Sequence, residues 1–128
     1  MLKVMCFGTF DGLHQGHLSY FKQAKKLGDC LMVVVARDIN VEKIKGRLPR
    51  QNEQIRLNAV AKLSFINEVC LGNAKDRMAV IRKFKPDVIA LGYDQEADTE
   101  KLQAEFPDIK IVRLKAYQPE KYKSSLMR

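Results

Sequence analysis

Few residues in this sequence could form disulfide bonds or metal–thiolate sites. It has three cysteines, Cys6, Cys30 and Cys70, and no C-x-x-C pair. An odd number at such wide spacing excludes a disulfide framework and the common zinc motifs. Two of the three stand in apolar runs, so we expect all three to be reduced core residues in a reducing compartment.

Long hydrophobic runs are also missing. The longest, residues 31–36, is far shorter than the roughly 20 residues that a membrane span needs. Residues 1–7 give way to a polar loop too soon to be a signal peptide. The sequence shows no internal repeat, low-complexity stretch or linker. We therefore expect one cytoplasmic domain over residues 1–128, without a membrane partner.

The charge is unbalanced toward the basic side. Twenty-three Lys and Arg against 15 Asp and Glu give a net charge of +8. We therefore expect an anionic partner, which could be nucleic acid, an acidic membrane or a phosphorylated metabolite. The sequence lacks an aromatic RNA-binding strand, a helix-turn-helix pattern and a tail of like charges, so we expect no nucleic acid.

Short apolar runs alternate with helical patterns along the chain. The runs at residues 2–7, 31–36, 66–71, 87–91 and 109–114 predict strands, and being apolar throughout they suit a sheet covered on both faces. Helical spacing marks residues 17–27, 52–63, 76–84 and 98–106. This alternation predicts an α/β fold, a doubly wound parallel sheet of about five strands with helices on both faces. Residues 37–51, which are rich in Lys and Arg, are expected to form a long mobile loop, and loops of this length are usually lids or binding loops. The alternative is a solvated connection whose charges serve solubility.

The segment G-T-F-D-G-L-H-Q-G-H, residues 8–17, directly follows the first predicted strand and opens a helix. Ligands of open α/β sheets bind at the carboxyl ends of strands, so a site is expected here. Gly8 and Gly12 permit a tight turn, and the helix start offers free N–H groups to an anion. His14 and His17, three residues apart, can project to the same side.

Two imidazoles at an anion site fit nucleotidyl transfer. That reaction builds extra negative charge on the α-phosphate and on the departing pyrophosphate, and positioned donors stabilise this charge. Both histidines of the chain lie in this window. Without a third ligand at a zinc-like spacing, we predict catalytic roles for His14 and His17 and no protein-held metal.

The same segment resembles the signature of the HIGH-type nucleotidyltransferase superfamily, in its cytidylyltransferase-like branch. A-K-K-L-G-D, residues 24–29, followed by an apolar strand, extends the resemblance. The resemblance implies a Rossmann-like fold, in-line attack on the α-phosphate of an NTP, assistance by Mg²⁺ and a possible homodimer. It further implies a loop lysine on the triphosphate, for which Lys43 and Lys45 are both candidates. Nucleotide-binding roles are implied for Gly8, Thr9, Phe10, Gly16, Arg56, Gly92, Asp94, Ser124 and Ser125.

Two features narrow the range of possible substrates within that branch. Residues 85–95, K-P-D-V-I-A-L-G-Y-D-Q, resemble archaeal-type FAD synthases, and Gly12 in the signature resembles the adenylyltransferase half of bacterial flavin enzymes. The resemblance implies ATP as donor and FMN as acceptor. The alternative is a CTP:glycerol-3-phosphate cytidylyltransferase, although the R-T-x-G-I-S-T-like run of those enzymes is absent. A different class, a non-catalytic nucleotide or nucleic-acid binder, also stays open.

Overall fold

The computed structural model describes residues 2–76, 78–92 and 99–115. In this part of the chain five parallel strands form one sheet in the order β3-β2-β1-β4-β5. The strands are β1 (Lys3–Gly8), β2 (Cys30–Val35), β3 (Glu68–Leu71), β4 (Val88–Leu91) and β5 (Lys110–Arg113). The chain moves outward in one direction from β1 to β3 and then returns to the other side of β1. The predicted parallel sheet of five strands is confirmed.

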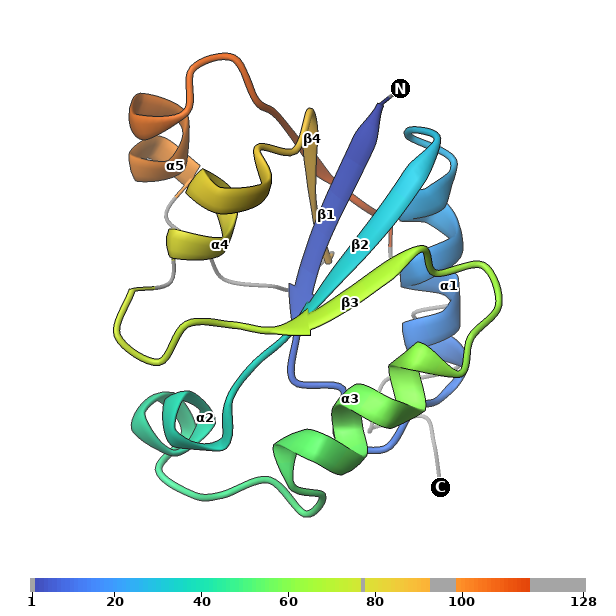
Figure 1. Ribbon diagram of the computed structural model, residues 1–128, viewed down its shortest axis with the longest axis vertical. Coiled ribbons are helices and arrows are strands. Elements are labelled where there is room, and N and C mark those ends of the chain that lie inside the picture. The colour runs from blue at the N-terminus through green and yellow to red at the C-terminus, as the bar shows by residue number, and fades with distance from the viewer. Residues whose placement is uncertain (1, 77, 93–98, 116–128) are drawn as a thin grey trace.

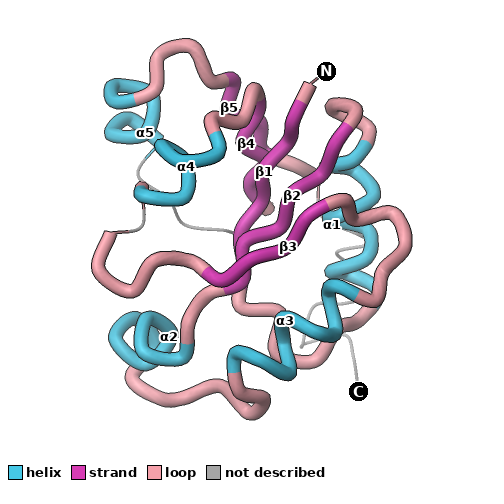
Figure 2. The backbone as a smooth tube through the Cα atoms, viewed as in Figure 1, coloured by secondary structure: helices cyan, strands magenta, loops and turns pink. Residues whose placement is uncertain are grey.

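Helices cover both faces of the sheet (Figures 1 and 2). α1 (Gln15–Lys25) and α3 (Glu53–Ala61) pack against one face, where Phe21, Ala24 and Val60 join the core. α4 (Ala79–Phe84) and α5 (Thr99–Glu105) cover the other with residues such as Ile81 and Leu102. The doubly wound architecture that the sequence predicts is therefore present.

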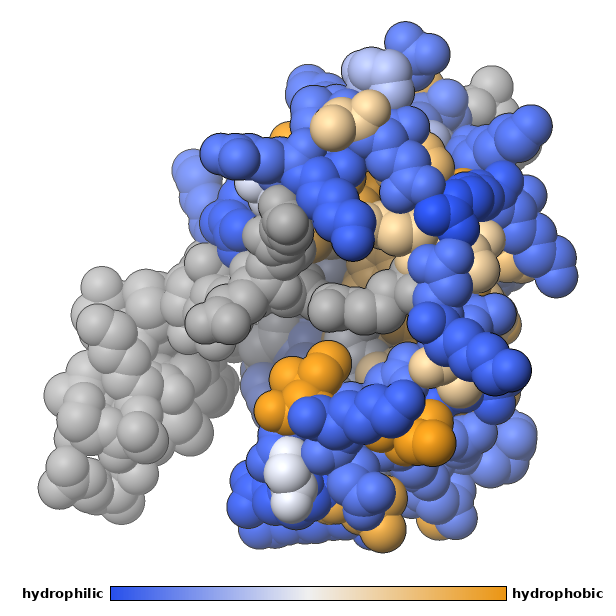
Figure 3. Space-filling view, turned by 90° about the vertical axis from the view of Figure 1, so that its left-hand side faces the viewer, coloured by the Kyte–Doolittle hydropathy of each residue, from blue (hydrophilic) through white to orange (hydrophobic). Residues whose placement is uncertain are grey.

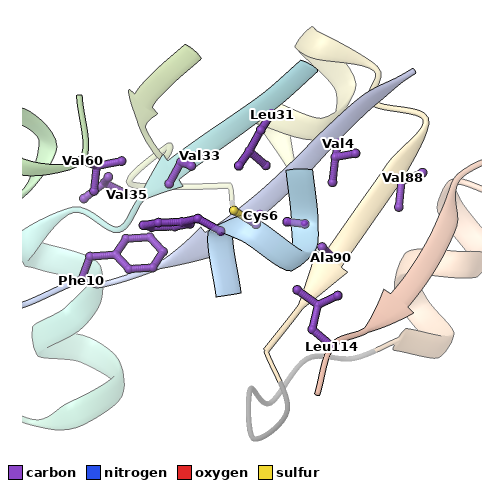
Figure 4. Close-up of a cluster of buried hydrophobic side chains, with 12 residues drawn as sticks. Val4, Cys6, Phe10, Leu31, Val33, Val35, Val60, Val88, Ala90 and Leu114 are labelled. Carbon is purple, nitrogen blue, oxygen red and sulfur yellow. The ribbon is translucent and has the colours of Figure 1, made fainter. Parts of the chain in front are cut away.

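The apolar runs are strands because burial on both faces leaves no position for a polar side chain. All six residues of β2 are buried. Figure 4 shows the core cluster on the α1 side, which Cys6 joins from β1 and Phe10 from the loop that follows it. The three cysteines are free thiols, and burial raises the pKa of Cys6 to about 12. In the described part of the chain, no helix has both the length and the apolar character that a bilayer crossing requires.

The prediction of a long loop at residues 37–51 is wrong, because this segment contains a helix, α2 (Asp38–Lys45). Gly46 ends this helix with φ of 77° and donates its N–H to the carbonyl of Glu42. The helix was hidden in the sequence because Val41 is its one buried residue. Its other side chains are polar or, like Ile44, exposed.

Candidate active site

The site begins where β1 ends, at the carboxyl edge of the sheet. Residues 9–14 form a loop from the end of β1 at Gly8 to the first turn of α1. That first turn contains no acidic residue, so nothing on the helix offsets the positive end of its dipole. Beside it, β1 pairs with β2 on one side and with β4 on the other. Successive strands are added on one side of β1 as far as β3 and then on its other side from β4, and ligands of doubly wound sheets bind where this order reverses.

The side chains of His14 and His17 each accept a backbone N–H at the start of α1 and so cap the helix together. The Gly16 N–H donates to His14 Nδ1 over 3.0 Å, and the His14 N–H donates to His17 Nδ1 over 3.3 Å. This is the reciprocal arrangement of a capping box, with imidazoles in place of the usual hydroxyl and carboxylate. The two rings stack with centroids 3.9 Å apart and planes 26° apart.

The capping hydrogen bonds determine which nitrogen of each histidine ring carries the proton. A nitrogen that accepts a hydrogen bond carries no proton, so each neutral ring carries its proton on Nε2. Within the described residues, neither Nε2 has a hydrogen-bond partner. The local fold thus provides two N–H donors at the positive end of a helix. Burial, with a smaller contribution from His14, lowers the pKa of His17 to about 4, so this ring is neutral near pH 7.

Gly16 is required by the position of the His14 ring. A Cβ at residue 16 would stand 2.8 Å from His14 Cε1 and 3.0 Å from Nδ1. Real Cβ atoms do not approach so closely, so any other residue would push the ring away from its capping position. The H-x-G-H spacing therefore has a structural reason: two capping histidines and room for the first of them to fold back.

Phe10 is a core residue in an unusual backbone conformation. Its φ is 55°, in the left-handed region that bulky residues avoid, and its side chain is 4% exposed. Its ring packs edge-on against His17 with centroids 5.4 Å apart. The same ring lies over Gly8, where a Cβ would be 2.5 Å from its Cζ atom. Gly8 and Phe10, both predicted to bind nucleotide, thus also determine where His17 lies.

Arg56, another predicted nucleotide-binding residue, is fully buried in α3 and has protein partners for three nitrogens. Nη1 donates to the carbonyl of Thr9 over 2.8 Å, and Nε donates to the carbonyl of Gln51 over 2.9 Å. Nη2 pairs with Asp38 Oδ1 at 2.7 Å. In this arrangement Arg56 holds the loop after β1, the start of α2 and the start of α3 together.

The remaining predicted site residues lie in α2, just past β4, or outside the described residues. Lys43 and Lys45 lie exposed in the last turn of α2, where neither ammonium pairs with another described side chain. The Gly92 carbonyl accepts a hydrogen bond from Arg113 Nη1 over 2.8 Å just past β4. Asp94, Ser124 and Ser125 lie outside the described residues.

No role was predicted from the sequence for the residues that connect these segments to one another. Asp11 lies inside the signature, and its carboxylate accepts two backbone N–H groups from residues 50 and 51. Glu53 accepts the Asp38 N–H and pairs with Arg37. The one usable signal was the presence of Asp11 in the signature. Across residues 2–76, 78–92 and 99–115, no three His, Cys, Asp or Glu side chains gather closely enough to hold a metal ion.

Comparison with known proteins decides the family. The cytidylyltransferase-like family model matches residues 5–128. The chain belongs to this family. Its members are nucleotidyltransferases, which confirms the enzyme class expected from the histidine pair and the resemblance drawn from residues 8–17.

Relatives within this family cover nearly all of the chain. FAD synthase of Thermoplasma volcanium is 41% identical over 132 residues, which span 100% of this chain and 92% of the relative. FAD synthase of Methanosarcina mazei is 45% identical, over 89% of this chain and 77% of its own. A crystal structure from Thermoplasma volcanium, described as a lipopolysaccharide core biosynthesis protein, superposes with a TM-score of 0.86 at 42% identity and covers 92% of this chain and 99% of its own.

Proposed function

We propose that this enzyme is an FAD synthase, which transfers AMP from ATP to the phosphate of FMN and releases pyrophosphate. Relatives of that name, at 41% and 45% identity, support the choice of substrates. The geometry that carries the chemistry is the pair of Nε2–H donors that His14 and His17 present at the start of α1.

In the proposed reaction a phosphate oxygen of FMN attacks the α-phosphorus of ATP in line with the departing pyrophosphate. One P–O bond forms and the bond to the β-phosphate bridging oxygen breaks, so the electron pair and the negative charge leave with pyrophosphate. FMN is a phosphate monoester, and its dianion needs no strong base near neutral pH. The enzyme has to position both substrates and stabilise the charge that builds up.

His14 and His17 suit the second task. Two N–H donors beside an unopposed helix dipole would stabilise the α-phosphate and the leaving oxygen. The low pKa of His17 makes its ring a neutral N–H donor near pH 7 before substrate binds. In this proposal Lys43 or Lys45 contacts the triphosphate, and the peptide groups of Gly8, Thr9 and Phe10 border the nucleotide.

A divalent cation, Mg²⁺ by our expectation, would enter bound to the triphosphate. We propose that substrate phosphates and water hold most of its coordination positions. When bound, it neutralises phosphate charge. We further propose that the enzyme acts without nucleic acid and forms a homodimer, which light scattering of the purified protein would test.

The decisive experiment measures pyrophosphate release with Mg²⁺, crossing ATP and CTP with FMN and glycerol 3-phosphate. Release with ATP and FMN alone, accompanied by FAD absorbance in the product, is the expected result. Release only with CTP and glycerol 3-phosphate would replace the proposed substrates by the cytidylyltransferase alternative and leave the roles of the histidines intact. Absence of turnover in all four mixtures would contradict the proposal.

A further inference from the structure

The helix that bears Lys43 and Lys45 is held in place by very little apolar burial. Val41 is the buried residue of α2, whereas Ile39 is 49% exposed and Ile44 is 67% exposed. Figure 3 shows apolar side chains at the surface among charged ones on the side of the molecule where α2 lies. With so small a buried apolar area, polar contacts have to determine where this helix sits.

The first of these contacts anchors the amino end of α2. Asp38, its first residue, pairs with the buried Arg56, which also binds the Thr9 carbonyl. Glu53 adds a second anchor by accepting the Asp38 N–H over 2.9 Å. The start of α2 is therefore connected to the loop of residues 9–14, which we call the histidine loop, and to α3.

The second contact anchors the segment that leaves the carboxyl end of α2. Asp11 Oδ2 accepts the Arg50 N–H over 2.8 Å, and Oδ1 accepts the Gln51 N–H over 2.9 Å. Gln51 returns the contact, because its Oε1 accepts the Gly12 N–H over 3.1 Å. The backbone donors of residues 50 and 51 lower the pKa of Asp11, which keeps it ionised. Three hydrogen bonds thus join two segments that are about 40 residues apart in sequence.

We propose that Asp11 is a positioning residue whose carboxylate fixes the segment after α2, and with it the Lys43–Lys45 turn, against the histidine loop. Both oxygens are used as acceptors, so an amide at this position would lose one contact and set an NH₂ group against a backbone donor. The proposal depends on the proposed function only for the ligand of the lysines, the triphosphate. In this proposal Asp11 acts through the lysines, by way of its contacts to the backbone of residues 50 and 51.

Asp11→Asn tests the proposal, with Asp29→Asn as the matched control. Asp29 likewise accepts a distant backbone N–H, that of Leu2 over 2.8 Å, but at the opposite edge of the sheet. The first measurement is amide hydrogen exchange without substrate. Asp11→Asn is expected to speed exchange about tenfold at residues 50–51 and in the last turn of α2, the size expected for losing one charge-assisted hydrogen bond. Exchange in α4 should not change, and Asp29→Asn should leave all of these sites as they are.

The second measurement is a double-mutant cycle on MgATP affinity. Asp11→Asn alone is expected to raise the Kd and the KM for ATP about tenfold with a smaller change in kcat. In a Lys43→Ala, Lys45→Ala background, the same substitution should have little further effect, because the side chains it positions are gone. Gln51→Leu, which removes only the contact to Gly12, should change exchange in the same direction by a smaller factor.

Unchanged exchange in the last turn of α2 would overturn the proposal. So would full additivity of Asp11→Asn with the lysine substitutions, since Asp11 would then act on the ligand by another route. Failure of the proposed function has a different signature: no turnover with ATP and FMN, while the exchange effect of Asp11→Asn persists. Should Asp11→Asn not fold, Gln51→Leu carries both measurements.

Discussion

Gly8→Ala is the substitution for which the structure gives the sharpest prediction. The added Cβ would stand 2.5 Å from Cζ, 2.7 Å from Cε1 and 2.9 Å from Cε2 of Phe10. Ordinary contact begins at 3.4 Å, so the ring has to retreat by about 1 Å. It has little room, because it is buried against Phe21 at a centroid distance of 4.9 Å and lies edge-on to His17.

Two consequences follow from that displacement. Overpacking a core of this kind costs about 1–3 kcal/mol, so we expect the free energy of unfolding to fall by about 2 kcal/mol. Because Phe10 supports the ring of His17, we also expect the Nε2 donor to move by a fraction of the same distance. Misplacement of a catalytic group by about 1 Å costs on the order of 100-fold in rate. We expect a loss of kcat of at least tenfold.

Gly72→Ala is the matched control, since Gly72 directly follows β3 much as Gly8 ends β1. There the nearest atom to an added Cβ is Val34 Cγ1 at 3.5 Å, an ordinary contact. Its unfolding free energy should change by less than about 0.5 kcal/mol, with full activity. Urea denaturation and turnover measurements on both variants test whether Gly8→Ala alone loses stability and activity.

A second substitution separates the ring from the backbone of residue 8. Phe10→Leu removes the atoms that the new Cβ would meet, so Gly8→Ala should cost less stability in that background than alone. Equal cost in both backgrounds, or a Gly8→Ala protein as stable and active as Gly72→Ala, would refute the packing argument.

Three further substitutions test the cap, the titration and the buried arginine. In His14→Asn the amide oxygen can still cap the Gly16 N–H, so the free energy of unfolding should change by less than about 1 kcal/mol. Loss of the Nε2 donor should lower kcat about 100- to 1000-fold. Equal losses of stability and activity would contradict separate roles for the two ring nitrogens. The pKa of His17 is about 4 when folded against 6.5 when unfolded, so stability due to its neutral ring is complete above pH 6.5 and is lost as pH falls toward 4. Urea midpoints of the wild type should therefore fall more steeply over this range than those of His17→Gln, which can keep the cap, and parallel curves would argue against the low pKa. Arg56→Met should cost about 3 kcal/mol in urea unfolding, because it leaves Asp38 and two carbonyls without their donor; a cost below about 1 kcal/mol would mean that water replaces those bonds.

Much of the fold could be predicted because it depends on local patterns. Residues 31–36 could be assigned to a buried strand, since an uninterrupted apolar run has few other places in a soluble domain. The helix predicted at residues 17–27, which the structure places at Gln15–Lys25, could be found from the spacing of its apolar residues, and Phe21 and Ala24 lie on its buried face. Alternation of such elements then left a doubly wound sheet as the natural arrangement.

α2 and its anchors could not be predicted, for the opposite reason. A helix with one buried residue carries almost no periodic signal. Its position depends on pairs such as Asp38 with Arg56 and Asp11 with residue 51, which are 18 and 40 residues apart. Any Lys- and Arg-rich segment offers many such pairings on paper, and the sequence does not indicate which of them form.

The histidine pair lies between these two cases. Its location could be predicted because both histidines of the chain follow a strand within one short window. The separate roles of the two nitrogens in each ring could not be predicted from the sequence, because they depend on the fold. Nδ1 accepts a hydrogen bond that caps α1, and this leaves the proton on Nε2 for a ligand. A Ser-x-x-Glu box would cap the helix equally well but would turn a carboxylate toward the anion. Histidine at both positions therefore meets two requirements with one side chain, capping through one nitrogen and hydrogen-bond donation through the other. Asn and Gln can cap through the amide oxygen, but their NH₂ group is bonded to the same carbon as that oxygen and does not reach the position of Nε2–H, which is why these substitutions should separate stability from catalysis.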